Sequence, residues 1–446
     1  MMCYNMNVKL YLAFSILIIA GCAATPKNKD PNHFSHISEG IKERTDYTLR
    51  DSPESNQFDF PEWVTLDDGL SQDEAVTLAL WNNAQLQVDL ATLGFARADL
   101  IEAKMIPNPA FSLLFPIGPK ALETDLGIPI DVLWQRHHRI AAANLDAQSL
   151  AEDLITNGLE LIRDVQTTYV GLWLSQKKLE LAIEDAQIQD EIIRLTQERF
   201  KAGDISGVEA EKIYVDSFES IGNMRSLIKE TDVTKQRLNT LLGLIEDNVA
   251  YNTETINIPE ESTYSIDTLL ETAFAARPDL RAAELTIEAA GKKIGWEKSK
   301  IYNFIAVIDA KDEGEDSLTI GPGIELDIPI FNQNQGQIAR AKAELEQAAR
   351  KYEALRQNII LQVRQAFTSY VSDYKEFELW NNDIIPYLQK KVEQTTKSFE
   401  IGEIPYLTIF EARQSLIEAK LKLVESTAHL LIDAAELNYW VGKKTI

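Results

Sequence analysis

Five carboxylates lie in two short segments in which polar and apolar residues alternate. The segments are "ALETDLGIPID" at 121–131 and "SLTIGPGIELDIPI" at 317–330. Period-two alternation predicts strands with one apolar and one polar face, and carboxylates along the polar face would favour cations beside it. The acidic residues that we expect to face an aqueous lumen are Glu123, Asp125, Asp131, Glu325 and Asp327. The alternative is that these charges only keep the polar face hydrated.

Cys22 suggests a different chemistry, because it follows an apolar run from Leu10 to Ala20. That run has the length of a signal-peptide core and is shorter than a membrane span. The residues Ile19-Ala20-Gly21-Cys22 resemble a bacterial lipobox. The resemblance implies that residues 1–21 are removed and that Cys22 carries palmitate and anchors the mature chain in the outer membrane. An ordinary secretory signal with an incidental cysteine is the alternative.

The remaining reactive residue types do not form a recognisable catalytic or metal-binding motif. Cys3 lies in the removed segment, so we expect neither a disulfide nor a cysteine metal site. His137 and His138 are adjacent and point apart, whereas a closed metal site needs about four ligands, so we interpret them as a solvated junction. A metal contact at the channel wall is the alternative. Motifs of serine hydrolases, phosphate loops and zinc proteases are missing from the sequence. The sequence therefore predicts no enzyme, no cofactor and no resident metal.

The composition excludes one partner class and restricts how the chain crosses a membrane. The formal net charge is −25 at pH 7, which repels nucleic-acid phosphates. After Cys22 no run approaches the roughly 18 apolar residues that a membrane helix needs. A crossing of the bilayer would therefore require a closed β-barrel.

Long helical segments surround the alternating segments, and the whole arrangement occurs twice. The phrase "RFKAGDIS" at 199–206 matches "SFEIGEIPYL" at 398–407 with a constant offset of 199 residues between their glycines, Gly203 and Gly402. A period of this size indicates a duplicated unit of domain size. Each half is expected to run helix, two strands, long helix, turn and helix. The expected helices are 71–106, 133–201 and 207–243 in the first half, and 333–400, kinked at Pro386, and 406–440 in the second.

Four strands per chain are too few for a barrel, because the smallest transmembrane barrels have about eight. Several chains must then share one barrel. Two copies would supply eight strands packed with their own side chains, whereas three copies would supply twelve strands and leave a lumen. Two soluble hairpins that cap a helical bundle are the alternative interpretation.

Several phrases together resemble the TolC-like outer membrane factor family. They are "ARPDL" at 276–280, "IPIFNQNQG" at 328–336 and the glycine-centred turns, set in duplicated helix and hairpin units over residues 71–443. "IPIFNQNQG" and the lipobox are closest to the CzcC/CusC branch, which serves metal-cation efflux. The resemblance implies a mainly α fold with a small β part. In it, three copies share a 12-stranded transmembrane β-barrel in the outer membrane and a helical α-barrel across the periplasm. The first half departs from the pattern, with "IPIDVLWQRHHR" at 128–139.

The resemblance also implies partners and a second group of site residues. A homotrimer would contact outer-membrane lipid and dock onto a periplasmic adaptor and an inner-membrane pump of the RND type. The two turns lie at the ends of the long helices that are far from the strands, so we expect them to bind the adaptor and to form the periplasmic aperture. These tip residues are Gly203, Asp204, Ser206, Glu209, Gly402, Glu403 and Glu411.

The expected organisation and function follow from these elements. The segments are a signal peptide 1–21, an anchored segment 22–70, a first repeat 71–243 with its hairpin at 109–131, a linker 244–265, a second repeat 266–440 with its hairpin at 303–330, and a tail 441–446. The expected function is a passive outer-membrane conduit that exports heavy-metal cations. The alternatives are the same channel serving drug or organic-compound efflux, and a structural envelope lipoprotein.

Overall fold

The structure is a computed structural model, which describes residues 34–50, 61, 64, 69–115, 121–244, 251–254, 256–259, 261, 263–312 and 318–446. The signal sequence and Cys22 lie outside the described residues, so lipidation stays a prediction. The side chain of Glu209 also lies outside the described part of the chain.

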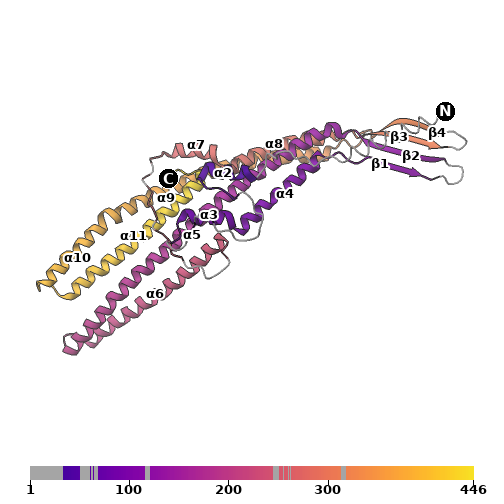
Figure 1. Ribbon diagram of the computed structural model, residues 1–446. Helices are drawn as coiled ribbons and strands as arrows, with labels where there is room; N and C mark the ends of the chain where they lie inside the picture. The colour runs from indigo at the N-terminus through magenta and orange to yellow at the C-terminus, as the bar shows by residue number, and fades with distance from the viewer. Residues whose placement is uncertain are drawn as a thin grey trace.

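The chain is an elongated rod with a small sheet at one end and two helical tips at the other (Figure 1). The elements of the first half are α2 (Phe34–Thr45), α3 (Gln72–Asn82), α4 (Ala84–Lys104), β1 (Ala110–Leu114), β2 (Leu122–Pro129), α5 (Val132–Ala202) and α6 (Gly207–Leu242). Those of the second half are α7 (Ile266–Ala276), α8 (Pro278–Ser299), β3 (Phe304–Asp312), β4 (Leu318–Leu326), α9 (Gln335–Glu378), the π-helix η1 (Leu379–Ile384), α10 (Ile385–Glu400) and α11 (Tyr406–Val441).

The long helices confirm the mainly α prediction. Helix α5 contains 71 residues, which at 1.5 Å per residue gives a length on the order of 100 Å. The expected interruption near Pro386 is present, and it takes the form of the π-helical turn η1 directly before α10. Proline lacks an N–H group, and the wider π-turn absorbs the lost helical hydrogen bond. Among the described residues, no helix is both long enough and apolar enough to span a bilayer.

The helix expected over 71–106 is wrong as a single element, because it breaks at Asn83. Ser71 and Glu74 form the predicted capping box at the start of α3. Asn83 then adopts an extended conformation, and its side chain accepts a hydrogen bond from the backbone N–H of Leu86. The chain therefore ends one helix and caps the next with a single residue.

The same break recurs in the second half and is tied to the end of a distant helix each time. Asn83 donates from its side-chain amide to the carbonyl of Leu241, 2.9 Å away, at the end of α6. Its counterpart Arg277 donates to the carbonyl of Trp440, 3.1 Å away, at the end of α11. A glycine with φ of +74° follows each of these helices, at Gly243 and Gly442. The two repeats are thus closed in the same way, each by a hydrogen bond from the residue at the helix break to the last turn of a distant helix.

Two apolar clusters hold the helices together, one in each half. The first joins α2, α3, α5 and α6 through residues such as Ile41, Leu78 and Leu238. The second joins α7, α9 and α11 through residues such as Leu269, Tyr370 and Leu437. Val170 of α5 and Ala428 of α11 form a smaller cluster that joins the halves. The core therefore lies in the middle of the rod, away from the sheet and the tips.

One half-buried carboxylate opposes this packing. Partial burial and, after it, the neighbouring carboxylate of Asp373 together raise the pKa of Asp433 to about 7. Asp433 lies in α11 and Asp373 in α9, two helices of the second cluster. An unfolded aspartate has a pKa of about 3.9, so the folded chain holds a proton that the unfolded chain loses. Stability should therefore fall as the pH rises from about 4 to about 7.

We predict that Asp433→Asn removes part of this pH dependence. The variant should melt at a higher temperature than the native protein at pH 8, while at pH 4 the two should melt at nearly the same temperature, because both lack the charge there. Circular dichroism of the purified protein in detergent measures both. A melting-temperature difference between variant and native protein that does not grow with pH would contradict the assignment.

The closing glycines give a second prediction with a matched control. An added Cβ at Gly442 would lie 2.9 Å from Cγ and 3.1 Å from Cα of Arg277, whereas at Gly402 it would meet open space. Gly402→Ala should cost only the left-handed conformation, about 1–2 kcal/mol. Gly442→Ala should cost about 1–3 kcal/mol more because of overpacking. Thermal melting compares the two, and equal losses would show that the contact with Arg277 does not matter.

Candidate functional site: a two-faced sheet and two helical tips

The four strands form one antiparallel sheet in the order β1-β2-β3-β4. Strands β2 and β3 come from different halves of the chain and pair directly, with Leu126 opposite Ile308. Because residues opposite each other in a sheet point to the same side, the register decides which side chains share a face.

One face of the sheet is apolar, and we call it the apolar face. Phe111 lies opposite Leu126, which lies opposite Ile308, and Ala306 lies opposite Ile324. Many of these side chains are exposed in the single chain, with Phe111 at 67% and Ile324 at 72%. Apolar side chains this exposed and this contiguous mark a surface that contacts another apolar phase. Its apolar members are Phe111, Leu113, Leu122, Leu126, Ile128, Phe304, Ala306, Ile308, Ala310, Leu318, Ile320, Pro322, Ile324 and Leu326. Thr124 and, at the end of β3, Asp312 share this face.

The opposite face carries most of the charges of the sheet, and we call it the polar face. Glu123 lies opposite Lys311, with 3.5 Å between Oε1 and Nζ, and Asp125 lies opposite Asp309. Ser112, Thr319 and Glu325 share this face, as do Gly127, Gly321 and Gly323. The register therefore brings together three of the five expected acidic residues, Glu123, Asp125 and Glu325. That this face lines an aqueous passage stays a prediction.

The other two expected acidic residues lie outside the strands. Asp131 precedes α5, and its carboxylate accepts a hydrogen bond from Gln135 at 2.8 Å. Asp327 follows β4, and its carboxylate accepts one from Asn303 at 3.1 Å. The predicted strand to residue 330 is therefore wrong beyond Leu326, because the β4 partner strand begins only at Phe304. Ile328 and Ile330 belong to the connection that leads to α9.

Sequence reasoning missed two residues of the polar face, Asp309 and Lys311. Their segment alternates less clearly, because Ile305 and Val307 are apolar and yet share the polar face. The signal that could have identified them is their own spacing, because two charged residues that lie two positions apart in a strand share one face. Asp309 places a second carboxylate opposite Asp125, where like charges repel across the pair.

The two tips have the same backbone geometry. Gly203 has φ of +79° and donates its N–H to Phe200, while Asp204 donates to Arg199. Gly402 has φ of +80° and donates to Phe399, while Glu403 donates to Ser398. Both are Schellman closures, which require a residue in the left-handed region. Each glycine has no neighbour within 4 Å of an added Cβ.

The polar side chains of the tips are exposed, including Asp204, Ser206, Glu403 and Glu411. Both tips lie at the end of the rod that is opposite to the sheet (Figure 1). The structure therefore brings the expected tip residues to the same end of the molecule.

The paired histidines lie at the start of α5. Their ring centroids are 5.6 Å apart at an interplanar angle of 64°. His138 packs over Gly295 of α8, whereas His137 is exposed. No group of three or more potential metal ligands occurs among the residues that the structure describes.

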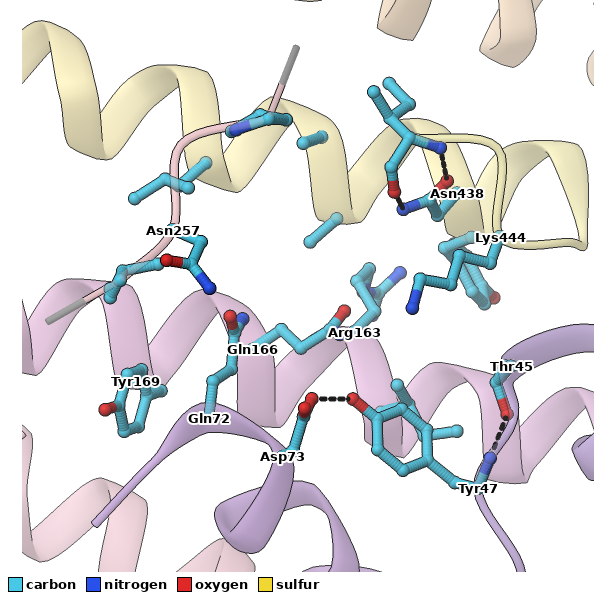
Figure 2. Close-up of a pocket in the computed structure, with 18 of the residues that line it drawn as sticks. Thr45, Tyr47, Gln72, Asp73, Arg163, Gln166, Tyr169, Asn257, Asn438 and Lys444 are labelled. Atoms are coloured by element: carbon cyan, nitrogen blue, oxygen red, sulfur yellow. Dashed lines mark hydrogen bonds between the residues drawn. The ribbon is translucent and has the colours of Figure 1, made fainter. Parts of the chain in front are cut away.

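A cavity of about 420 Å³ lies at mid-rod between α5, α11 and the segments around residues 45–47, 71–73 and 254–259 (Figure 2). Tyr47 donates its hydroxyl to Asp73 at 2.5 Å, and burial followed by this contact raises the pKa of Tyr47. Arg163 pairs with Asp164 at 2.6 Å and lies over the ring of Tyr439. These charged groups pair within the chain, and the residues that line the cavity come from the N-terminal segment and from both halves.

Comparisons with known proteins agree with this architecture. The sequence model of the family described as "Outer membrane efflux protein" matches residues 269–443. The chain is 22% identical over 358 residues to the cobalt-zinc-cadmium resistance protein CzcC of Cupriavidus metallidurans, covering 79% of this chain and 85% of that protein. It is 21% identical over 324 residues to nodulation protein T of Rhizobium leguminosarum bv. trifolii, covering 70% and 68%.

Solved structures share the fold at low identity. The crystal structures of CusC superpose with a TM-score of 0.68 at 17% identity, covering 90% of this chain and 99% of that one. The CmeC outer membrane channel of Campylobacter jejuni gives 0.69 at 15% identity, covering 90% and 95%. The chain thus shares the fold of outer-membrane channels, in which long helical hairpins carry a small sheet. Its similarity to the outer membrane efflux protein family over residues 269–443, and to CzcC over most of the chain, points to a family of channels and not of enzymes, whose members lie in the outer membrane and extend into the periplasm.

The two faces of the sheet give a prediction with a control one residue away. Ile324→Arg places a charge on the apolar face and should lower the yield of membrane-inserted protein, at a cost of about 2–4 kcal/mol if it lies near the bilayer midplane. Glu325→Arg places the same charge on the polar face and should insert normally. Quantifying both variants in outer-membrane fractions tests the assignment. Equal yields would show that lipid does not contact the apolar face.

Proposed function

We propose that three copies of this chain form one passive efflux conduit, in which their sheets close a twelve-stranded barrel. The segregation of the two faces by the strand register carries this proposal. A barrel of this kind needs lipid-facing apolar side chains outside and polar side chains inside. Within the described sheet, β1 and β4 each pair on one side only. Pairing of β4 with β1 of the next copy would satisfy both edges.

The helices would continue the passage into the periplasm as a tunnel. Helix α5 alone extends the rod on the order of 100 Å from the sheet. The tips would then lie deep in the periplasm, where a membrane-anchored adaptor and an inner-membrane pump could meet them. Carboxylates at the tips, in threefold copies, would repel each other unless cations or a partner relieve them. The tips would thus serve as both aperture and docking surface.

The cargo that we propose is metal cations. The support is the similarity to a protein named for cobalt, zinc and cadmium resistance, together with the acidic polar face and a net charge of −25. Organic compounds are the second candidate, because nodulation protein T, whose name mentions no metal, is nearly as similar. A lipid anchor on Cys22 would add attachment at the outer membrane.

Conductance in planar bilayers tests the conduit and its preference for cations. The double variant Asp125→Asn, Asp309→Asn should lower the cation-to-anion permeability ratio by roughly half, because it removes facing carboxylates from the lumen wall. Lys311→Met should raise the ratio, since it removes the cation that neutralises Glu123. Pores with an unchanged ratio in both variants would refute the lumen assignment, and an absence of pores would refute the conduit.

Substitutions at the tips test docking separately. Gly203→Trp and Gly402→Trp should leave insertion and oligomer size normal, yet abolish cross-linking to the adaptor and metal resistance of the cell. Gly203→Asn and Gly402→Asn are the matched controls, because asparagine tolerates the left-handed conformation and adds little bulk. If the tryptophan variants still export normally, the docking surface lies elsewhere.

A further inference from the structure

The cavity at mid-rod, which we call the mid-rod cavity, has the size and the lining of a small-molecule site. Its volume of about 420 Å³ falls within the roughly 300–1,000 Å³ of ordinary ligand pockets. Leu159 and Ile162 of α5, with Leu431 of α11, form an apolar wall, and polar side chains from the other segments complete the lining. Because apolar surface alone selects little, those polar groups decide which ligand fits.

Two primary amides in the lining have no hydrogen-bond partner within the described part of the chain. They belong to Gln72, the first residue of α3, and to Asn257, in the segment between the two repeats. Figure 2 shows both side chains pointing into the cavity. A primary amide donates and accepts hydrogen bonds at once. The two groups therefore match a ligand that carries a donor and an acceptor side by side, as a peptide bond does.

One end of the cavity is basic, because Lys443 and Lys444 line it directly after α11. The side chain of Asn438 holds this segment in place by accepting a hydrogen bond from the backbone N–H of Thr445 at 2.7 Å. Lys443 forms no ion pair with a described residue. The Nζ of Lys444 lies 3.8 Å from a carboxylate oxygen of Asp46, and both of these side chains are mostly exposed. An exposed pair of this kind contributes little, so both ammonium groups are available to a carboxylate.

The other end of the cavity is acidic. The backbone N–H of Glu254 donates to the hydroxyl of Tyr169 at 3.0 Å, which fixes this residue at the cavity wall, and its carboxylate forms no ion pair with a described residue. Tyr169 and Lys444 lie at opposite sides of the cavity (Figure 2). Arg163 and Asp73, which also line it, are already paired within the chain. The cavity thus offers an unpaired negative charge at one end and positive charges at the other.

We propose that the mid-rod cavity binds a short peptide with free ends, of about three residues, which span roughly 10 Å when extended. The ammonium group of the peptide binds Glu254, and its carboxylate binds Lys443 and Lys444. Its backbone amides pair with Gln72 and Asn257, and its side chains meet the apolar wall. The peptide would join segments from three distant parts of the chain, so its binding should stabilise the fold. The proposal does not depend on the conduit function.

Isothermal titration calorimetry of the protein in detergent tests the site with trialanine as the probe. Trialanine should bind, whereas its N-acetylated form and its C-amidated form should each bind about tenfold or more weakly, because each lacks one charged end. Trialanine should also raise the melting temperature, and the doubly capped peptide should not. If residues of the chain or of a neighbouring copy fill the cavity in the assembled protein, trialanine does not bind, and the proposal fails. Equal binding of free and capped peptides overturns it as well.

Substitutions at the two ends of the cavity locate the bound peptide. Glu254→Gln should weaken trialanine binding about tenfold or more and should remove the difference between trialanine and its N-acetylated form. Lys443→Gln with Lys444→Gln should instead remove the difference between the carboxylate and the amide. A general loss of structure would weaken all the peptides alike and would not remove one difference while it leaves the other.

The matched control is Glu353→Gln with Lys351→Gln, which neutralises one exposed carboxylate and one exposed ammonium group of α9 far from the cavity lining. This variant should bind every peptide as the native protein does. If the variants at the cavity also keep both differences between free and capped peptides, the peptide binds elsewhere, and the assignment of the mid-rod cavity is wrong.

Discussion

The register between β2 and β3 is the constraint on which the rest of the structure depends. It joins the two halves of the chain and aligns Leu126 with Ile308 and Asp125 with Asp309. A slip of one residue would mix apolar and charged side chains on both faces. With the observed register, one face can meet lipid and the other can meet water. The sheet is therefore useful only in a closed assembly, which one chain with four strands cannot form alone.

The long helices connect the sheet at one end of the rod to the tips at the other, and different contacts hold them together along the way. The core lies at mid-rod, where the breaks at Asn83 and Arg277 tie the short helices to the ends of α6 and α11. Toward the tips, ion pairs such as Lys420 with Glu184 and Lys178 with Glu425 link α11 to α5. The tips themselves are closed by glycines with open space around them. Stability and function thus depend on different parts of the same helices.

Much of this fold could be predicted from the sequence, and the exceptions have physical reasons. The long helix α5 follows from a segment almost free of proline and glycine, and the strands follow from alternation. The break at Asn83 was missed because an asparagine without proline or glycine is a weak stop signal, and its cap depends on the distant Leu241. The pairing of Asp125 with Asp309 was missed because register between distant segments cannot be read from either one alone. The aperture, the lumen and the lipid anchor stay predictions.

The number of chains in the membrane-inserted assembly tests the central claim most directly. Three sheets of four strands make a closed barrel with a lumen, whereas two sheets would make a filled one. Native mass spectrometry of the protein extracted from outer membranes in detergent counts the copies. The account predicts three copies of the mature chain in one complex. A stable monomer or dimer that still forms pores would contradict it.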